Sequence, residues 1–84
     1  MKVYVLSCNW ATDGSCDDYI EVYESYEKAV NALKEAVETD KREESIPEYW
    51  LEDDFNCENY YRAWREDEYC MNHIEYKITA CEVQ

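Results

Sequence analysis

Hydrophobic and polar residues alternate at both ends of the chain, which predicts strands there. Residues 3–10 alternate first, and residues 18–24 repeat the pattern after the turn-forming pair Asp13-Gly14. Two alternating segments joined by turn residues predict a hairpin with a longer loop. Alternation returns over residues 73–83, so a third strand is expected to close the chain.

Helical periodicity follows the hairpin. Ser25 precedes a segment in which apolar residues recur every three or four positions, and a serine hydroxyl in that place caps a helix N-terminus. Charged residues of both signs fill the opposite side, where pairs four residues apart support one another. The pattern predicts a helix over residues 26–42, whose apolar stripe consists of Tyr26, Ala29, Val30, Leu33, Ala36 and Val37.

The next segment also predicts helix. Residues 45–48 (SIPE) match a capping box with an early proline, which indicates a short helix over 46–53. Asn56 is a second candidate cap, and side chains recur at three- or four-residue spacing within 57–70, which predicts another helix there. These two segments could also form one bent helix.

The predicted fold is therefore α+β. It is a small antiparallel sheet of three strands with helices packed mainly on one face, in the order β-β-α-α-(α)-β. A chain of 84 residues is expected to form one domain, residues 1–84. The other sheet face is expected to carry tyrosines, and either the later helices cover it or it is a partner or dimer surface.

Aromatic residues compensate for a shortage of aliphatic ones. Leu, Ile, Val and Phe number only 14 of 84 residues, a proportion at which highly charged chains tend to be disordered. The chain also has nine tyrosines and three tryptophans, and each large ring buries about 150–250 Å². We therefore expect a folded domain with an aromatic-rich core.

Net charge restricts the class of partner. The chain has 21 acidic and eight basic residues and a formal charge of -13, which repels nucleic acid and anionic membranes and attracts basic protein surfaces. The apolar runs are too short for an export signal or a membrane span, so we expect a cytoplasmic protein. Its five cysteines are then expected to be reduced thiols.

Most of the negative charge lies between residues 43 and 68. Ten acidic residues oppose only Arg62 and Arg65 there, and six of the 13 aromatic residues lie among them. Carboxylates on a rigid helical frame imitate the phosphate spacing of a duplex, so a basic groove built for nucleic acid would bind them. A solvated surface that only confers solubility is the alternative. The candidate partner-binding residues are Glu48, Trp50, Glu52, Asp53, Asp54, Glu58, Tyr61, Trp64, Glu66, Asp67 and Glu68.

The sequence indicates no catalytic, metal or cofactor site. Gly14 is the sole glycine, which excludes P-loop and dinucleotide-binding fingerprints. Cys70 and His73 have the spacing of two zinc ligands, but a structural zinc site needs about four, and Cys57 and Cys81 would have to complete it. We therefore expect a protein that is not an enzyme.

Three segments resemble small acidic proteins of Firmicutes phages and mobile elements: 2–6 (KVYVL), 21–29 (EVYESYEKA) and 72–78 (NHIEYKI). Anti-CRISPR proteins of similar size and charge belong to that population, and several of them act by occupying basic nucleic-acid sites on a nuclease. The resemblance implies an inhibitor of a host defence system that acts in the cytoplasm of a bacterial host cell. It transfers no individual functional residue.

Three functional hypotheses follow. The first is a non-enzymatic inhibitor, monomeric or homodimeric, that docks on a basic nucleic-acid-binding protein such as a CRISPR nuclease and mimics nucleic acid without binding it. The second is a small homo-oligomeric adaptor that uses its tyrosine-rich sheet face. The third is a ligand-sequestering assembly, which requires basic residues among Lys2, Arg62, Arg65 and Lys77 to converge on a phosphate-bearing ligand.

Overall fold

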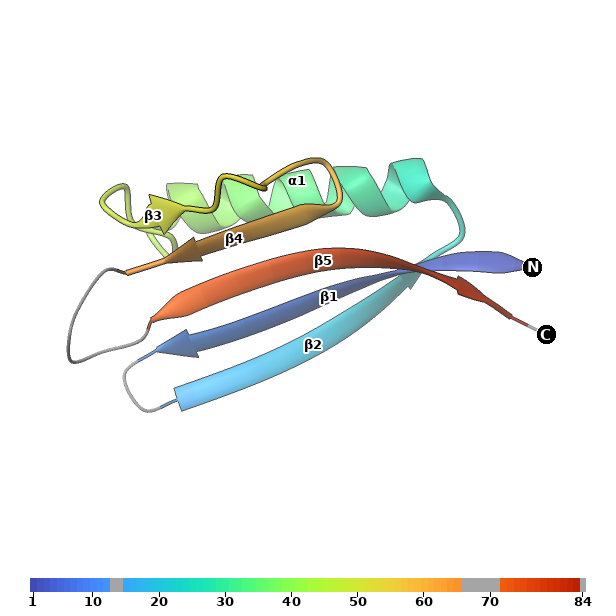
Figure 1. Ribbon diagram of the computed structural model, residues 1–84, viewed down its shortest axis with the longest axis horizontal. Helices are drawn as coiled ribbons and strands as arrows, with labels where there is room; N and C mark the ends of the chain where they lie inside the picture. The colour runs from blue at the N-terminus through green and yellow to red at the C-terminus, as the bar shows by residue number, and fades with distance from the viewer. Residues whose placement is uncertain (13–14, 66–71, 84) are drawn as a thin grey trace.

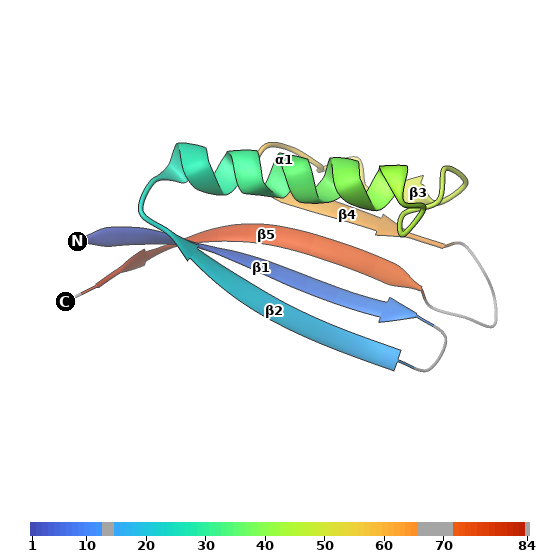
Figure 2. The same ribbon diagram turned by 180° about the vertical axis from the view of Figure 1, so that it is seen from behind.

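The computed structural model describes residues 1–12, 15–65 and 72–83, which form one antiparallel sheet covered by one helix. The elements are β1 (Lys2–Thr12), β2 (Ser15–Tyr23), α1 (Tyr26–Arg42), β3 (Leu51–Glu52), β4 (Tyr60–Trp64) and β5 (His73–Glu82). The strand order is β2-β1-β5-β4-β3, so β2 and β3 are the edge strands. Figures 1 and 2 show α1 lying along one face of the sheet. Across the described ranges, no helix has the length and apolarity needed to cross a membrane.

The hairpin, the first helix and the closing strand are confirmed. β1 pairs with β2, β5 pairs with β1, and α1 has the predicted bounds. The Ser25 hydroxyl accepts the backbone N–H of Lys28 at 3.2 Å, which is the bond expected of a capping serine. The buried members of the apolar stripe are Ala29, Val30, Leu33 and Val37. They join the same core as the buried sheet residues, so the stripe fixes the helix on the sheet.

The prediction of three strands and several helices is wrong. The described residues form five strands and one helix, in the order β-β-α-β-β-β. Residues 46–53 form turns and the two-residue β3 instead of a helix. The described part of 57–70 forms a turn and β4, and residues 66–71 lie outside the description. The class remains α+β.

β4 is a strand because its side chains alternate between core and surface. Tyr61 and Ala63 are buried, whereas Tyr60, Arg62 and Trp64 are half-buried. A run this short fits a period of two and a period of four equally well, which is why it also resembled a helix. The segment forms a strand because it pairs with β5 and β3, and its aromatic side chains also favour strand conformation.

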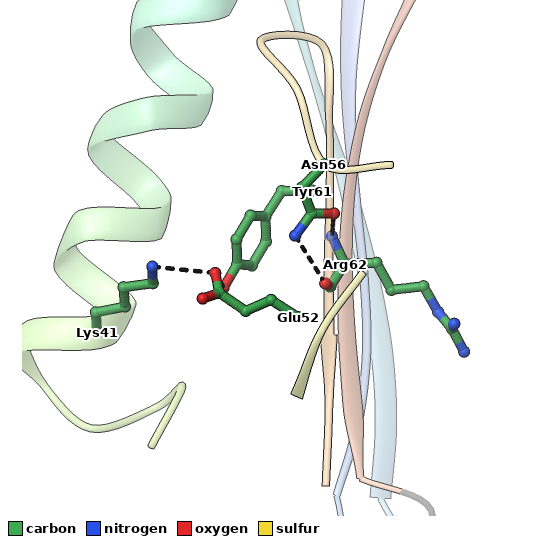
Figure 3. Close-up of polar contacts among 5 residues, drawn as sticks. All are labelled: Lys41, Glu52, Asn56, Tyr61 and Arg62. Carbon is green, nitrogen blue, oxygen red and sulfur yellow. Dashed lines mark hydrogen bonds and ion pairs between the residues drawn. The ribbon is translucent and has the colours of Figure 1, made fainter. Parts of the chain in front are cut away.

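Asn56 does not cap a helix; its side chain forms hydrogen bonds with the backbone of β4. Its side-chain amide donates to the Arg62 carbonyl oxygen at 3.1 Å, and its side-chain oxygen accepts the Arg62 N–H at 2.8 Å (Figure 3). The side chain thus takes the place of a neighbouring strand backbone. Asparagine serves both as a helix cap and as such a mimic, so its identity alone does not distinguish the two roles.

The face of the sheet that α1 covers is the one that carries most of the strand tyrosines. Cys8 lies opposite both Tyr19 and Tyr76, and paired residues share a face. Because Cys8 and Tyr76 belong to the core under the helix, the prediction that tyrosines occupy the other face is wrong. The uncovered face instead carries aliphatic side chains, including Ile20 and Val22, which are 67% and 60% exposed.

After α1, the backbone turns through a left-handed residue. Glu44 has a φ of 62°, the one positive φ of a non-glycine residue in the described chain. Its N–H donates to the Lys41 carbonyl at 3.3 Å, and the Ile46 N–H donates to the Asp40 carbonyl at 3.0 Å, so both of these carbonyls in the last turn are satisfied. A side chain in this conformation costs about 1–2 kcal/mol, and the buried Ile46 helps to hold it there.

Candidate functional site

The candidate partner-binding residues are divided between the core and the surface. Trp50 and Tyr61 are 9% and 7% exposed, so neither is a surface anchor. Trp64 is half-buried, and the Arg62 guanidinium lies over its ring, 5.0 Å from the centroid. The candidates Glu66, Asp67 and Glu68 lie outside the described residues.

Two of the candidate carboxylates help to hold the fold. Glu52 on β3 accepts from the Lys41 ammonium at 3.2 Å and from the Tyr61 hydroxyl at 2.9 Å, which ties the edge strand to α1 and β4 (Figure 3). Asp53 lies 3.9 Å from the Arg62 guanidinium. The helical frame predicted for these carboxylates is therefore replaced by strands and turns.

The remaining described candidates face solvent. Glu48 and Asp54 are exposed. Glu58 is exposed as well, and it accepts the hydroxyl of Tyr26, at the start of α1, at 2.9 Å. These side chains keep their charge at the surface.

Tyrosine hydroxyls donate to five of the carboxylates. A hydroxyl stabilises a carboxylate by hydrogen bonding without neutralising it, as a lysine or arginine would do. The five pairs are Tyr23–Glu21, Tyr26–Glu58, Tyr60–Glu75, Tyr61–Glu52 and Tyr76–Asp40. The chain thereby gains specific contacts and retains its negative charge.

The hydrogen bonds and burial raise the pKa of these phenols. The bond to Glu21 raises the pKa of Tyr23 to about 12. Burial first, and then the bond to Glu52, raise the pKa of Tyr61, whereas the same bond lowers the pKa of Glu52. At neutral pH each phenol therefore remains a donor, and Glu52 remains charged.

Exposed carboxylates line β2, the first edge of the sheet. We call Asp17, Asp18, Glu21 and Glu24 the first acidic edge; all four are exposed. No lysine or arginine occurs between residues 2 and 28. The prediction that most of the negative charge lies between residues 43 and 68 missed this edge, although the long stretch without a basic residue indicates it.

The opposite edge, around β3, is also acidic. Residues 43–58 contain no lysine or arginine. We call their acidic residues the second acidic edge: Glu43, Glu44, Glu48, Glu52, Asp53, Asp54 and Glu58. Four strand spacings of about 4.8 Å separate β2 from β3, so the two acidic edges lie roughly 19 Å apart.

The described residues include 17 acidic and eight basic side chains, which gives them a net charge of -9. The molecule measures 45 × 22 × 22 Å, and its long strands run along the long axis (Figure 1). Along the 45 Å axis this is about one net charge every 5 Å, a lower density than the spacing of about 3.4 Å along one strand of duplex DNA. α1 has four acidic and four basic residues, so the helix adds nothing to this surplus.

The structure describes only part of the predicted zinc pattern. Cys70 lies outside the described residues. Within the described ranges, no three His, Cys, Asp or Glu side chains are close enough together to hold a metal ion. Cys57 and Cys81, which would have to complete the pattern, are exposed free thiols.

The basic residues of the ligand-sequestering hypothesis do not converge on one face. Lys77 and Arg62 lie on the uncovered face, because they alternate with the buried residues of β5 and β4. Figure 3 shows the Arg62 side chain pointing away from α1. Lys2 lies four residues before Leu6 on β1, so the two share a face, and Leu6 is buried under the helix. The sheet therefore separates Lys2 from Arg62 and Lys77.

No family model, no curated protein and no solved structure matches the chain. The functional proposal therefore rests on the two acidic edges and on the tyrosine hydroxyls that donate to Glu21, Glu52 and Glu58 within them. Both features come from the described residues.

Proposed function

We propose that this protein is a non-enzymatic inhibitor that binds the basic nucleic-acid-binding surface of another protein, such as a CRISPR nuclease, and thereby competes with nucleic acid. The observation that carries the proposal is the pair of acidic edges, whose sequence segments contain no lysine or arginine and in which, among the described residues, only Glu52 and Asp53 pair with basic side chains. The resemblance to small acidic phage proteins supports the choice of a host-defence enzyme as the target. The predicted helical mimic is replaced by a sheet with two charged edges.

Electrostatics supplies both the attraction and the selectivity in this proposal. A groove lined with lysine and arginine binds polyanions largely by releasing their counterions, so its affinity falls steeply with salt. The first acidic edge runs from Asp17 to Glu24 and, at about 3.4 Å per residue, would contact such a groove over about 24 Å, roughly half of the 45 Å long axis. The chain's own charge of -13 keeps it from binding the nucleic acid itself.

Competition binding tests the proposal. Purified CRISPR nucleases are titrated with this protein, and displacement of guide RNA or target DNA is measured at several salt concentrations. We expect displacement that weakens steeply as salt rises. The triple variant Asp17→Asn, Asp18→Asn, Glu24→Gln should bind at least tenfold more weakly, because it removes three exposed charges from the first acidic edge.

A matched variant controls for the number of charges removed. Glu27→Gln, Glu35→Gln, Glu38→Gln also removes three exposed carboxylates, but from α1, whose charges are balanced. It should bind nearly as the wild type does. Equal losses in both triple variants would show that only net charge matters, and undiminished displacement by the first variant would refute the proposal.

A second candidate function is homo-oligomerisation through the uncovered face. Ile20 and Val22 on β2 are 67% and 60% exposed and lie beside the β1 residues Ser7 and Val5. An apolar patch on an uncovered sheet face is typical of an interface. Sedimentation at increasing protein and salt concentrations tests this function, since salt screens the repulsion between copies. A strict monomer throughout would refute it.

A further inference from the structure

A cavity lies between the last turns of α1, the loop that follows it and the helix-covered side of the sheet. Its volume is about 620 Å³, within the range of about 300–1,000 Å³ that holds small ligands. Five aromatic side chains line it: Trp10, Tyr19, Tyr49, Trp50 and Tyr76. Aromatic rings present an electron-rich face, so this lining favours a cation over an anion.

Asp40 makes the cavity negative at its helix end. The carboxylate is partly buried and accepts the Tyr76 hydroxyl. Burial raises the pKa of Asp40, Tyr76 opposes that effect, and the nearby charge of Glu43 adds to it. The position is also in the last turn of α1, where the helix dipole disfavours a negative charge. A cation bound beside Asp40 would relieve each of these costs.

The other charged groups limit where that cation can lie. Glu44 lines the cavity as Asp40 does. Arg65 and His73 line it at the start of β5, where the Arg65 N–H donates to the Asn72 carbonyl at 2.8 Å. Arg65 would repel a cation near it, so the favourable position is the end formed by Asp40, Tyr76 and Tyr19. Cys8, buried there beside the two phenols, is neutral at physiological pH because burial raises its pKa.

Trp50 adds a second feature of the cavity wall. Its indole nitrogen is buried and has no hydrogen-bond partner, the one such side-chain atom among the described residues. An unsatisfied buried donor costs about 1–3 kcal/mol. Because this nitrogen is buried beneath the surface that a ligand would contact, Trp50 contributes its ring alone to the cavity lining.

We infer that this cavity binds a guanidinium group, as presented by an arginine side chain. A guanidinium is planar, stacks on aromatic rings and donates to a carboxylate through two parallel N–H groups, so it fits both the rings and Asp40. The inference extends the proposed function: a basic nucleic-acid-binding surface is the source of such a side chain, and the cavity would anchor one arginine of it.

Small probes test the cavity without the partner. Nα-acetyl-arginine amide is titrated into the full chain, and binding is followed by tryptophan fluorescence, because Trp10 and Trp50 line the cavity. We expect saturable binding. The neutral isostere Nα-acetyl-citrulline amide should bind at least tenfold more weakly, since it lacks the charge that Asp40 attracts. Equal binding of the two probes would overturn the inference, as would the absence of saturable binding by the arginine probe.

Two variants locate the site. Asp40→Asn keeps an oxygen that accepts the Tyr76 hydroxyl but removes the charge, and it should weaken binding of the arginine probe about tenfold or more. Glu38→Gln, two positions away and exposed on α1, is the matched control and should leave binding unchanged. Undiminished binding by Asp40→Asn would place the cation elsewhere and overturn the inference.

The proposed inhibitor function and the proposed guanidinium site can be refuted independently. An arginine-rich peptide added as a second probe should bind more tightly than the single amino-acid amide if a protein surface is the source of the guanidinium. If the peptide binds no better, the cavity serves free guanidinium compounds and its link to the partner is refuted. If nuclease displacement fails but the arginine probe binds through Asp40, the proposed function is wrong and the cavity remains a guanidinium site.

Discussion

The two acidic edges have the same sign of charge, but the structure uses them differently. On the first edge, the carboxylates make only local contacts: Asp17 accepts the neighbouring Asp18 N–H, and Glu21 accepts the Tyr23 hydroxyl two residues away. On the second edge, contacts span the fold. Glu52 reaches Lys41 and Tyr61, and Glu58 accepts from Tyr26, which is 32 residues away in sequence.

The difference indicates that the carboxylates of the first edge are available for a partner, whereas several carboxylates of the second edge stabilise the fold. β2 is held by nine residue pairs with β1, so its backbone needs no help from the acidic side chains. β3 has only two residues paired with β4, and Glu52 compensates through side-chain bonds. Changes on the first edge should therefore affect binding alone, whereas several on the second should also destabilise the fold.

The largest expected loss of stability follows removal of Glu52. Glu52→Ala deletes the acceptor of the buried Tyr61 hydroxyl and the ion pair with Lys41. An unsatisfied buried hydroxyl costs about 1–3 kcal/mol, so we expect the free energy of unfolding to fall by about 2 kcal/mol in urea denaturation. Asp18→Ala, on the first edge, should change it by less than about 0.5 kcal/mol.

A double-mutant cycle with Tyr61→Phe identifies the source of that loss. If the Tyr61 hydroxyl is the group left unsatisfied, Glu52→Ala should cost much less in the Tyr61→Phe background. Losses that simply add would show that the hydrogen bond is not responsible. A large loss in Asp18→Ala would contradict the contrast between the edges.

The next largest effect is expected at Asn56, which pairs with β4 where the second edge lacks a full strand. Asn56→Ala removes two hydrogen bonds with the Arg62 backbone, at 3.1 and 2.8 Å. At about 1 kcal/mol per bond, the free energy of unfolding should fall by about 1–2 kcal/mol. Asn56→Asp keeps the acceptor alone and should lose about half as much; a loss equal to that of Ala would mean that the accepted Arg62 N–H contributes little.

The contrast between the edges also explains which elements the sequence predicted. Residues 2–42 form a hairpin and a helix stabilised by neighbours in sequence, so alternation, the Ser25 cap and the apolar stripe were sufficient. Residues 43–65 are organised by distant partners. The Asn59 carbonyl accepts the Ile78 N–H, and β4 pairs with β5. A local pattern cannot show such pairing, and a capping-box motif at 45–48 pointed to a helix instead.

The candidate site was predictable in composition but not in arrangement. The acidic surplus around 43–58 is visible in the sequence. Its position opposite Asp17 and Asp18 depends on the order β2-β1-β5-β4-β3, which requires the unpredicted strands. Trp50 and Tyr61 resembled surface anchors because aromatic residues serve core and interface alike, and burial decides between the two roles.

A smaller effect, of opposite sign, is expected at Glu44 on the second edge. Its φ of 62° is costly for a residue with a Cβ and free for glycine. Glu44→Gly should therefore raise the free energy of unfolding by up to about 1 kcal/mol, measured as an increase in the urea midpoint. Glu48→Gly removes a charge from the same edge at an ordinary φ and should bring no gain. An equal gain in both variants would assign the effect to charge repulsion.

The smallest effect is expected in the pH dependence, where Glu52 and Asp40 should act in opposite directions. The pKa of Glu52 is lowered by its bonds to Tyr61 and Lys41, so the stability it contributes is lost as pH falls through the window below its ordinary value of about 4.3. The pKa of Asp40 is raised by burial, so the folded state binds its proton more tightly than the unfolded state does. Stability should therefore fall as pH rises from about 3.9 through the raised value.

Asp40→Asn isolates the second of these two effects, because the amide has no charge and still offers an oxygen to Tyr76. The variant should be more stable than the wild type at neutral pH, and the difference should shrink as the wild-type carboxyl becomes protonated in acid. Thermal unfolding at a series of pH values measures both curves. A variant that is less stable than the wild type at neutral pH would mean that the Asp40 charge is already paired, and the cavity beside it would then have no unbalanced charge for a cation to satisfy.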